Sequence, residues 1–255
     1  MDWSVIIDNL DRFVSGTLLT LQLTAVSVVL GFCIALPLAL ARMSRHWFLW
    51  MPSYAYIFYF RGTPLLVQVF LIYYGIGQYY ADHPEFRAYL QEIGLWTYLR
   101  NPYPYALLTL TLNTGAYAAE IIRGGILGVP HGEVEAARAC GMPHLLMLRR
   151  IILPRAFRIA LPAYTNDVVF TFQATSLVSI ITIMDLTGVA RVLISRSFAA
   201  FEIWIFVGAL YCAISYAILY GFQLLEFSWS GHLRERPGMA TAAKPAPARA
   251  AALIR

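Results

Sequence analysis

Residues 133–157 read EVEAARACGMPHLLMLRRIILPRAF, a basic stretch that separates two long apolar regions. The whole chain is 59% hydrophobic and only 13% charged, whereas ordinary soluble domains are about 25% charged. Apolar runs of about 20 residues are long enough to cross a bilayer as helices. We therefore interpret 133–157 as a connection outside the membrane, and the regions on either side of it as membrane spans.

The quoted stretch has the composition of two short helices. Glu133 and Glu135 place negative charge near the amino-terminal end of the first helix, where the helix dipole favours it. Ala136 and Ala137 give that helix a small, strongly helical surface, and Gly141 suits the left-handed conformation that ends many helices. Such a bent pair is suited to press into a groove of a partner protein. An ordinary amphipathic linker is the alternative.

Five regions are long and apolar enough to span a membrane, and buried helices of a soluble core rarely run so far without charge. We predict an all-α integral membrane protein with a transmembrane domain at residues 1–232. Its five transmembrane helices are expected at about 13–41, 51–80, 103–126, 159–184 and 203–227. The tail at 233–255 is rich in Ala and Pro and has no apolar period, so we predict a disordered cytoplasmic extension.

Proline and glycine predict two interruptions of the helices. The sequence RGTP at 61–64 is expected to break the second span into two half-helices. A bilayer tolerates such a break only where protein or water satisfies the freed backbone groups. In the quoted stretch, Met142–Pro143 is expected to begin the second short helix, and Leu153–Pro154 to mark the return towards the membrane.

Lys and Arg near the span ends predict the orientation, because cytoplasmic connections carry an excess of these residues. The first connection holds Arg42 and Arg45, and both the third connection and the tail are strongly basic. Connections on the opposite side balance their arginines with acidic residues. We therefore place the amino terminus outside and the carboxyl terminus in the cytoplasm. Because topology explains most of the net charge of +5, no nucleic-acid partner is predicted.

The sequence offers no convincing catalytic or metal-binding pattern. It lacks the GxxxxGK[ST] loop that cradles phosphates, so it cannot bind and hydrolyse ATP by that route. The five histidines are scattered over connections and the tail, and the three cysteines lack the spacing of a metal site or a disulfide framework. We predict no enzyme activity and no cofactor or metal of its own.

Ionisable residues inside the predicted spans are costly to bury, so we expect them to be paired or functional. Arg61 and Glu120 are candidates for an intramembrane ion pair that braces the broken second span. Direct contact of these residues with substrate is the alternative. A local pair between Glu120 and Arg123 also competes, because the two lie three residues apart on one helix.

Asp167 is the acidic residue of the fourth predicted span. Together with Asn166, Gln173 and Thr175 it is expected to line a substrate-binding cavity. A carboxylate there would attract a cationic side chain or an α-ammonium group. The alternative is that Asp167 is neutral, or paired with a partner subunit.

Several motifs resemble those of one known family. The pattern Glu-Ala-Ala, three residues, Gly, nine residues, Ile, one residue, Leu-Pro is similar to the signature of the membrane subunits of bacterial ATP-driven importers. Seven positions match it at full spacing: Glu135, Ala136, Ala137, Gly141, Ile151, Leu153 and Pro154. The stretches RGTPLLVQ at 61–68, AYAAEIIRGG at 116–125 and ATSL at 174–177 resemble motifs of the polar amino acid importers. The resemblance thus extends over most of the chain.

The resemblance implies a type I ABC importer permease fold, with coupling helices at about 130–150 that sit in a cleft of a cytoplasmic ATP-binding subunit. The implied ATPase-coupling residues are Glu135, Ala136, Ala137, Gly141, Leu153 and Pro154. It also implies a second permease subunit, with a heterodimer favoured, and a periplasmic binding protein that delivers a polar amino acid. ATP and Mg²⁺ would be held by the ATP-binding subunit. The chain would lie in the bacterial inner membrane, with its amino terminus in the periplasm.

One position departs from the family pattern and bears on the substrate. Many relatives have Lys where this chain has Gln173, and Gln there is similar to the subset that handles basic amino acids and opines. A secondary transporter or channel for polar amino acids that works without ATP is the alternative function. The absence of duplicated halves and the presence of the 133–157 segment weigh against it. No cluster of acid–base or metal-binding residues supports a membrane enzyme.

Overall fold

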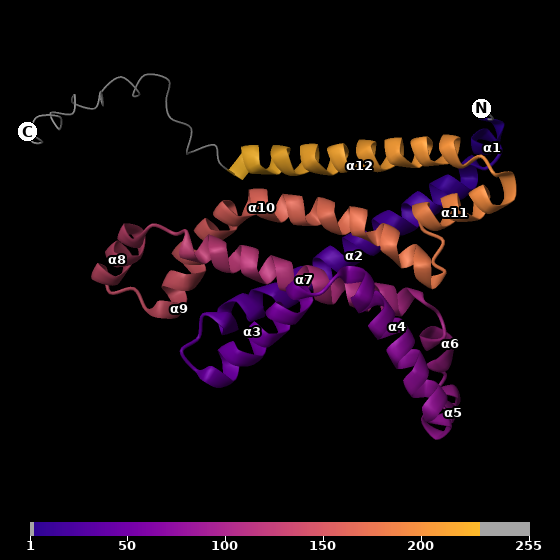
Figure 1. Ribbon diagram of the computed structural model, residues 1–255. Helices are drawn as coiled ribbons and strands as arrows, with labels where there is room; N and C mark the ends of the chain where they lie inside the picture. Colours follow the sequence, from indigo (N-terminus) through magenta and orange to yellow (C-terminus); the bar gives the residue numbers. More distant parts are fainter. Residues whose placement is uncertain (1–2, 230–255) are drawn as a thin grey trace, which may run out of the picture.

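The computed structural model describes residues 3–229, so the predicted tail at 233–255 lies outside the described residues. The predicted all-helical fold is confirmed over this part of the chain (Figure 1). The longer helices are α2 (Leu10–Arg42), α3 (Trp47–Gly62), α4 (Leu65–Asp82), α7 (Tyr103–Leu127), α10 (Leu153–Ala174), α11 (Leu186–Ser197) and α12 (Ala200–Trp229). The shorter ones are α1 (Ser4–Ile7), α5 (Pro84–Glu92), α6 (Trp96–Leu99), α8 (His131–Ala139) and α9 (His144–Met147).

The long helices form an elongated bundle with an open side. α10 packs between α7 and α12, while α3 and α4 diverge from the bundle on the side of α7 (Figure 1). α8 and α9 project at the same end of the bundle as the carboxyl end of α12, and α1 and α11 lie at the opposite end (Figure 1). The bundle therefore has two distinct ends, one of which carries the quoted segment.

Candidate membrane spans are present, but their number is smaller than the five expected. α2 and α12 are each long and apolar enough to cross a bilayer. Two bent pairs meet the same requirement together: α3 with α4, and the helix from His144 to Ile181 with α11. The described residues therefore contain two to four candidate spans by length and composition, and α7 is not among them. The count of five stays a prediction.

The predicted break in the second span is confirmed. α3 ends at Gly62 and α4 begins at Leu65, with an angle of 107° between the two helices. The buried amide of Gln68 donates to the carbonyl oxygens of Phe60 at 2.9 Å and Thr63 at 3.0 Å. This side chain thus supplies the hydrogen bonds that the end of α3 loses at the break, as a non-aqueous environment requires.

α7 is the central helix, since it packs against α2, α3, α4 and α10. Many of its buried residues are small or polar, among them Thr109, Asn113 and Gly115. At Gly125, an added Cβ would lie 2.5 Å from the carbonyl oxygen of Ala156 on α10, so only glycine permits this close approach. Because neighbouring helices shield α7, its surface needs less apolar character than that of α2 or α12.

The quoted stretch returns to the bundle at Leu153–Pro154, where α10 begins. α9 continues through a π-helical turn (Leu148–Ile152) directly into α10. Pro154 lies in the first turn of α10, and proline cannot supply an amide donor to the preceding turn. A wider π turn at this point accommodates the missing donor, so the chain returns to the bundle as a continuous helix.

The fourth span differs from the single element expected at 159–184. α10 ends at Ala174 and is followed by a 3₁₀ segment (Thr175–Ile181), after which the chain turns by 47° into α11. Thr182 at this turn has a left-handed backbone, with φ of 67°. The buried Asp185 caps α11, because its Oδ1 accepts a hydrogen bond of 2.8 Å from the amide of Gly188.

Candidate functional site: a charge cluster beside an open helix face

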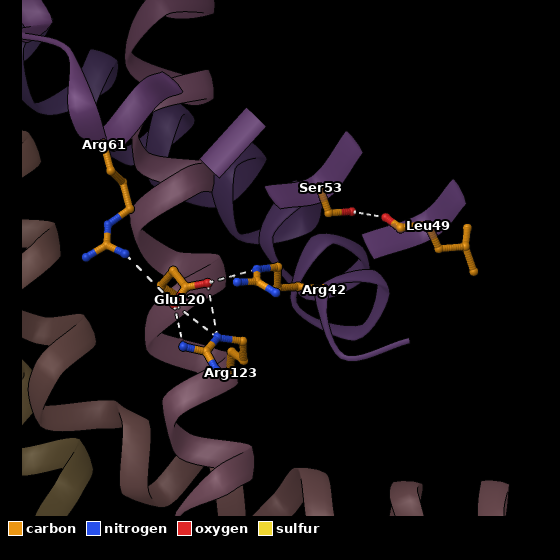
Figure 2. Close-up of polar contacts among 6 residues, drawn as sticks. All are labelled: Arg42, Leu49, Ser53, Arg61, Glu120 and Arg123. Atoms are coloured by element: carbon orange, nitrogen blue, oxygen red, sulfur yellow. Dashed lines mark hydrogen bonds and ion pairs between the residues drawn. The ribbon is translucent and has the colours of Figure 1, made fainter. Parts of the chain in front are cut away.

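A charge cluster forms where α2, α3 and α7 meet. We define the Glu120 cluster as Glu120 with Arg42, Arg61 and Arg123. Figure 2 shows three guanidinium groups converging on the single carboxylate from different directions. One negative and three positive charges leave the cluster with two positive charges in excess.

The three arginines do not share the carboxylate equally. Arg123, one helical turn away on α7, donates to both carboxylate oxygens at 2.7–3.1 Å. Arg61 Nη1 and Arg42 Nε approach Glu120 only to 3.9 and 4.0 Å, which is beyond hydrogen-bond distance. The local pair that competes for Glu120 is therefore the closer one. Charge attraction alone holds Arg42 and Arg61 to it.

Arg42 and Arg61 lie on opposite sides of Glu120 (Figure 2). The Arg42 guanidinium lies 4.6 Å from the ring centre of Tyr54 on α3. The Arg61 guanidinium lies 5.3 Å from the ring centre of Tyr117 on α7. Both contacts are within the range of a cation–π interaction. Each arginine thus has its own aromatic neighbour, and Arg61 is the one that lies beside Tyr117.

The residues predicted to line a cavity on α10 fall on two different faces of the helix. Asp167 and Thr171 are buried, and the Thr171 hydroxyl lies 3.0 Å from that of Thr114 on α7. Asn166 and Gln173 lie on an exposed stripe, since residues seven apart share a helix face. The structure therefore brings Asn166 and Gln173 together, and places Asp167 on the neighbouring face.

Asp167 is the more unusual of these residues. Asp167 is only 7% exposed, and its Oδ2 has no hydrogen-bond partner within residues 3–229. A buried carboxylate oxygen without a partner is costly. Asp167 therefore has the capacity to accept a further donor.

Gln173 and Thr175 have separate surroundings. Gln173 lines a cavity of about 560 Å³ between α10 and α12, together with Ser176, Tyr211 and Ser215. Its amide nitrogen lies 3.5 Å from the hydroxyl of Ser215. Thr175 is fully buried, and its hydroxyl donates to the Phe172 carbonyl at 2.7 Å. The hydroxyl proton of Thr175 is thus already used within its own helix.

At the end of the bundle, α8 carries the residues predicted to couple to an ATPase. Glu135 and Ala136 are exposed there, whereas Ala137 is buried against the segment that follows. Leu153 is partly buried and Pro154 is exposed on the first turn of α10. The exposed side of α8 therefore lies open at this end of the molecule (Figure 1).

Gly141 ends α8 in the way that its residue type predicts. It has φ of 72°, in the left-handed region. The amide of Met142 donates to the Ala137 carbonyl at 3.1 Å, and that of Gly141 donates to the Arg138 carbonyl at 2.9 Å. These two bonds form a Schellman motif, which fixes the bend between α8 and α9. Glu133 adds an ion pair of 3.4 Å to Arg155 on α10.

Two features of the site escaped prediction from the sequence. Arg42 was read only as a charge that sets orientation, yet it belongs to the Glu120 cluster. Tyr117 carried no sign that it would contact both Arg61 and Phe170. Both depend on helix packing, which residue spacing does not reveal. Within residues 3–229, no group of three or more His, Cys, Asp or Glu is placed to hold a metal ion.

Comparison with protein families gives one match over most of the chain. Residues 27–228 match the model described as "Binding-protein-dependent transport system inner membrane component". The octopine transport system permease protein of Rhizobium radiobacter is 47% identical over 214 residues, which are 84% of each chain. The nopaline transport system permease protein of Agrobacterium fabrum is 43% identical, covering 93% of this chain and 96% of the relative. The histidine/lysine/arginine/ornithine transport system permease protein of Escherichia coli is 38% identical, over 86% and 90% of the two chains.

Solved structures show the same fold. A chain from the structure titled "Crystal structure of an amino acid ABC transporter with histidines" matches with a TM-score of 0.75 and 33% identity, covering 89% of this chain and 98% of that one. A chain of an inward-facing methionine ABC transporter matches with a TM-score of 0.70 and 20% identity, covering 87% and 98% of the two chains.

Proposed function

Because the chain belongs to the family of binding-protein-dependent transport system inner membrane components, we propose that it moves basic amino acids or opines across the inner membrane. It is the permease subunit of an ATP-driven amino acid importer, and hydrolysis belongs to a separate ATP-binding subunit. Its relatives are named for octopine, nopaline and the basic amino acids, all of which carry a cationic group. These names support a cationic substrate for this chain as well.

Within the molecule, Asp167 is the residue that best supports a cationic substrate. It is a buried acid on α10 whose Oδ2 lacks a partner, and it borders the exposed stripe that holds Asn166 and Gln173. A cationic group in transit would supply the missing donor and the compensating charge. We assign Asp167 to contact with the substrate, and Asn166 and Gln173 to the lining of its route. Thr175, the other residue predicted to line it, is fully buried and is not assigned to that route.

The partners follow from the family in general and from this chain in particular. Such a permease works with an ATP-binding subunit, a substrate-binding protein and a second permease. For this chain we propose a heterodimer with a related permease. We also propose that α8 and Gly141 dock on the ATP-binding subunit, and that this end of the bundle faces the cytoplasm. The arginine-rich connection around α8 supports that orientation.

The replacement Asp167→Asn tests the substrate class, since it keeps size and hydrogen bonding and removes the charge. At an effective dielectric constant of about 20, a charge pair about 4 Å apart is worth roughly 4 kcal/mol before desolvation. A fraction of this lowers uptake of arginine by at least about tenfold, while uptake of glutamine changes little. The measurement is ATP-driven uptake into proteoliposomes with saturating binding protein. Wild-type uptake of arginine by an assembled Asp167→Asn complex would make Asp167 structural.

A further inference from the structure

Arg61 is more than a brace for the broken span, because Glu120 does not depend on it. Arg123 already occupies both carboxylate oxygens of Glu120 at 2.7–3.1 Å. Arg61 stays at 3.9 Å from Glu120, and its side chain is 44% exposed. Among residues 3–229, no acceptor receives a hydrogen bond from the Arg61 side chain. Its planar fork of N–H donors is therefore available to another acceptor.

The position of Arg61 follows from the break in the second span. It lies in the last turn of α3, directly before Gly62, and so stands at the bend between α3 and α4. Hydrogen bonds from Gln68 and Asn113 hold this bend, with the Asn113 amide 3.0 Å from the Gln68 side-chain oxygen. These hydrogen bonds do not involve the Arg61 side chain, so the bend does not depend on it.

A short chain of contacts leads from Arg61 to the open face of α10. Tyr117 lies between them, 5.3 Å from the Arg61 guanidinium and 6.3 Å from the ring centre of Phe170. Phe170 is 52% exposed and lies one turn from Asn166 on the exposed stripe. Asp167 borders the same stripe. Exposed Arg and Asn side chains are costly in contact with lipid tails, so we expect this face to meet water or another subunit.

We propose that Arg61 binds the carboxylate of the transported amino acid or opine, opposite the cation-binding carboxylate of Asp167. The assignment of the cationic end to Asp167 rests on the proposed function, whereas the carboxylate site at Arg61 rests on its own geometry. A guanidinium matches a carboxylate with two parallel hydrogen bonds, which a carboxylate of Glu120 at 3.9 Å does not receive. Arg61 can turn to the substrate without leaving Glu120 unpaired, since Arg123 remains in place.

The site selects for a substrate with separated charges of opposite sign. Every amino acid supplies at least one carboxylate, so Arg61 serves as a general anchor. Asp167 adds a requirement for positive charge at the other end. A ligand that lacks the carboxylate leaves the Arg61 donors without an acceptor, which lowers affinity strongly where a site is built around hydrogen bonds.

The test compares L-arginine with agmatine, which is arginine without its carboxylate. Binding of each is measured on the complete transporter complex in nanodiscs, without the binding protein, so that only the membrane site is probed. The wild-type complex is expected to prefer L-arginine by at least about tenfold. Arg61→Gln should lower L-arginine affinity to that of agmatine and leave agmatine within about twofold. Absence of the wild-type preference, or equal losses for both ligands, would overturn the proposal.

Arg42→Gln is the matched control. Arg42 has the same type of side chain and nearly the same distance to Glu120, 4.0 Å, but it lies on the side of Tyr54, away from Tyr117. It should retain the wild-type preference for L-arginine. Loss of that preference in both variants would mean that Arg61 acts only through the Glu120 cluster, which contradicts a separate carboxylate site.

Further experiments distinguish failure of the proposed carboxylate site at Arg61 from failure of the proposed cationic substrate. If the complex binds neither arginine nor agmatine but binds L-glutamine, the cationic substrate is wrong. The carboxylate site is then tested with L-glutamine against 4-aminobutanamide, its decarboxylated form, and the same loss of preference is expected in Arg61→Gln. Should Arg61→Gln fail to assemble, Arg61→Lys keeps the charge but not the fork. It should reduce the preference by at least about threefold, and an unchanged preference in Arg61→Lys overturns the proposal.

Discussion

Glu120 illustrates how a single carboxylate organises its surroundings at the scale of one residue. Three arginines compete for it, and geometry ranks them: Arg123 forms a fork of hydrogen bonds, whereas Arg42 and Arg61 only approach. The hydrogen-bonded pair should couple strongly, because its charges are partly shielded from solvent. A pair at 3.9 Å with a 44% exposed partner is screened and should couple weakly.

Double-mutant cycles should reproduce that ranking. Neutralising Glu120 and Arg123, singly and together, is expected to give a coupling free energy of about 1–3 kcal/mol in the unfolding of the detergent-solubilised complex. The same cycle with Glu120 and Arg61 should give less than about 1 kcal/mol. Unfolding by increasing denaturing detergent measures both. A stronger coupling of Glu120 to Arg61 than to Arg123 would contradict the geometry.

Residue type and spacing reveal only part of such a site. The three-residue spacing of Glu120 and Arg123 indicates a local pair from the sequence alone, because helix geometry fixes it. The approach of Arg42 depends on how α2 crosses α7, and the separation of Asp167 from Gln173 depends on which face of α10 the neighbours cover. Local spacing cannot fix a packing angle, so those features needed the structure.

At the scale of elements, local sequence signals predicted where some helices end, whereas contacts between helices determined the other boundaries. The sequence RGTP marked the break between α3 and α4, and Gly141 marked the end of α8, since both depend on backbone chemistry close by. Pro154 lies in the first turn of α10, but the sequence did not show that a π turn joins α9 directly to α10. The early end of α10 and the separate α11 depend on contacts with α2 and α12, which spacing does not show.

The left-handed turn at Gly141 allows a test of the bend between α8 and α9. Gly141→Val forces a β-branched residue to φ of 72° and should distort the bend, whereas Gly141→Asn tolerates that conformation. If this bend docks on the ATP-binding subunit, Gly141→Val should lose that subunit on purification or uncouple hydrolysis from uptake. Gly141→Asn should retain most of both.

An added Cβ at Gly141 meets no atom of this chain within 4 Å, so steric crowding inside the permease does not explain a defect. Co-purification and the ratio of ATP hydrolysed to substrate imported are the two measurements. Normal assembly and coupling in Gly141→Val would remove this bend from the docking surface.

At the scale of the whole molecule, the two ends of the bundle should lie on opposite sides of the membrane. In a background without the native cysteines, His46→Cys probes the connection between α2 and α3, and Gln91→Cys probes α5. Both positions are exposed. A membrane-impermeant maleimide should label Gln91→Cys in cells with a permeable outer membrane. His46→Cys should react only after the inner membrane is opened, because basic connections stay in the cytoplasm. The reverse pattern would invert the proposed orientation.

The central place of α7 has a consequence for how the protein is made. A helix that carries Thr109, Asn113, Glu120 and Arg123 partitions poorly into lipid by itself, since such residues lower the gain from membrane insertion. Its neighbours α2, α3 and α4 are synthesised before it, and α10 follows. Most of the helices that pack against α7 are therefore already synthesised when α7 emerges. If α7 is a membrane span, as the sequence predicts, we expect its entry into the bilayer to be a cooperative step that depends on the helices inserted before it.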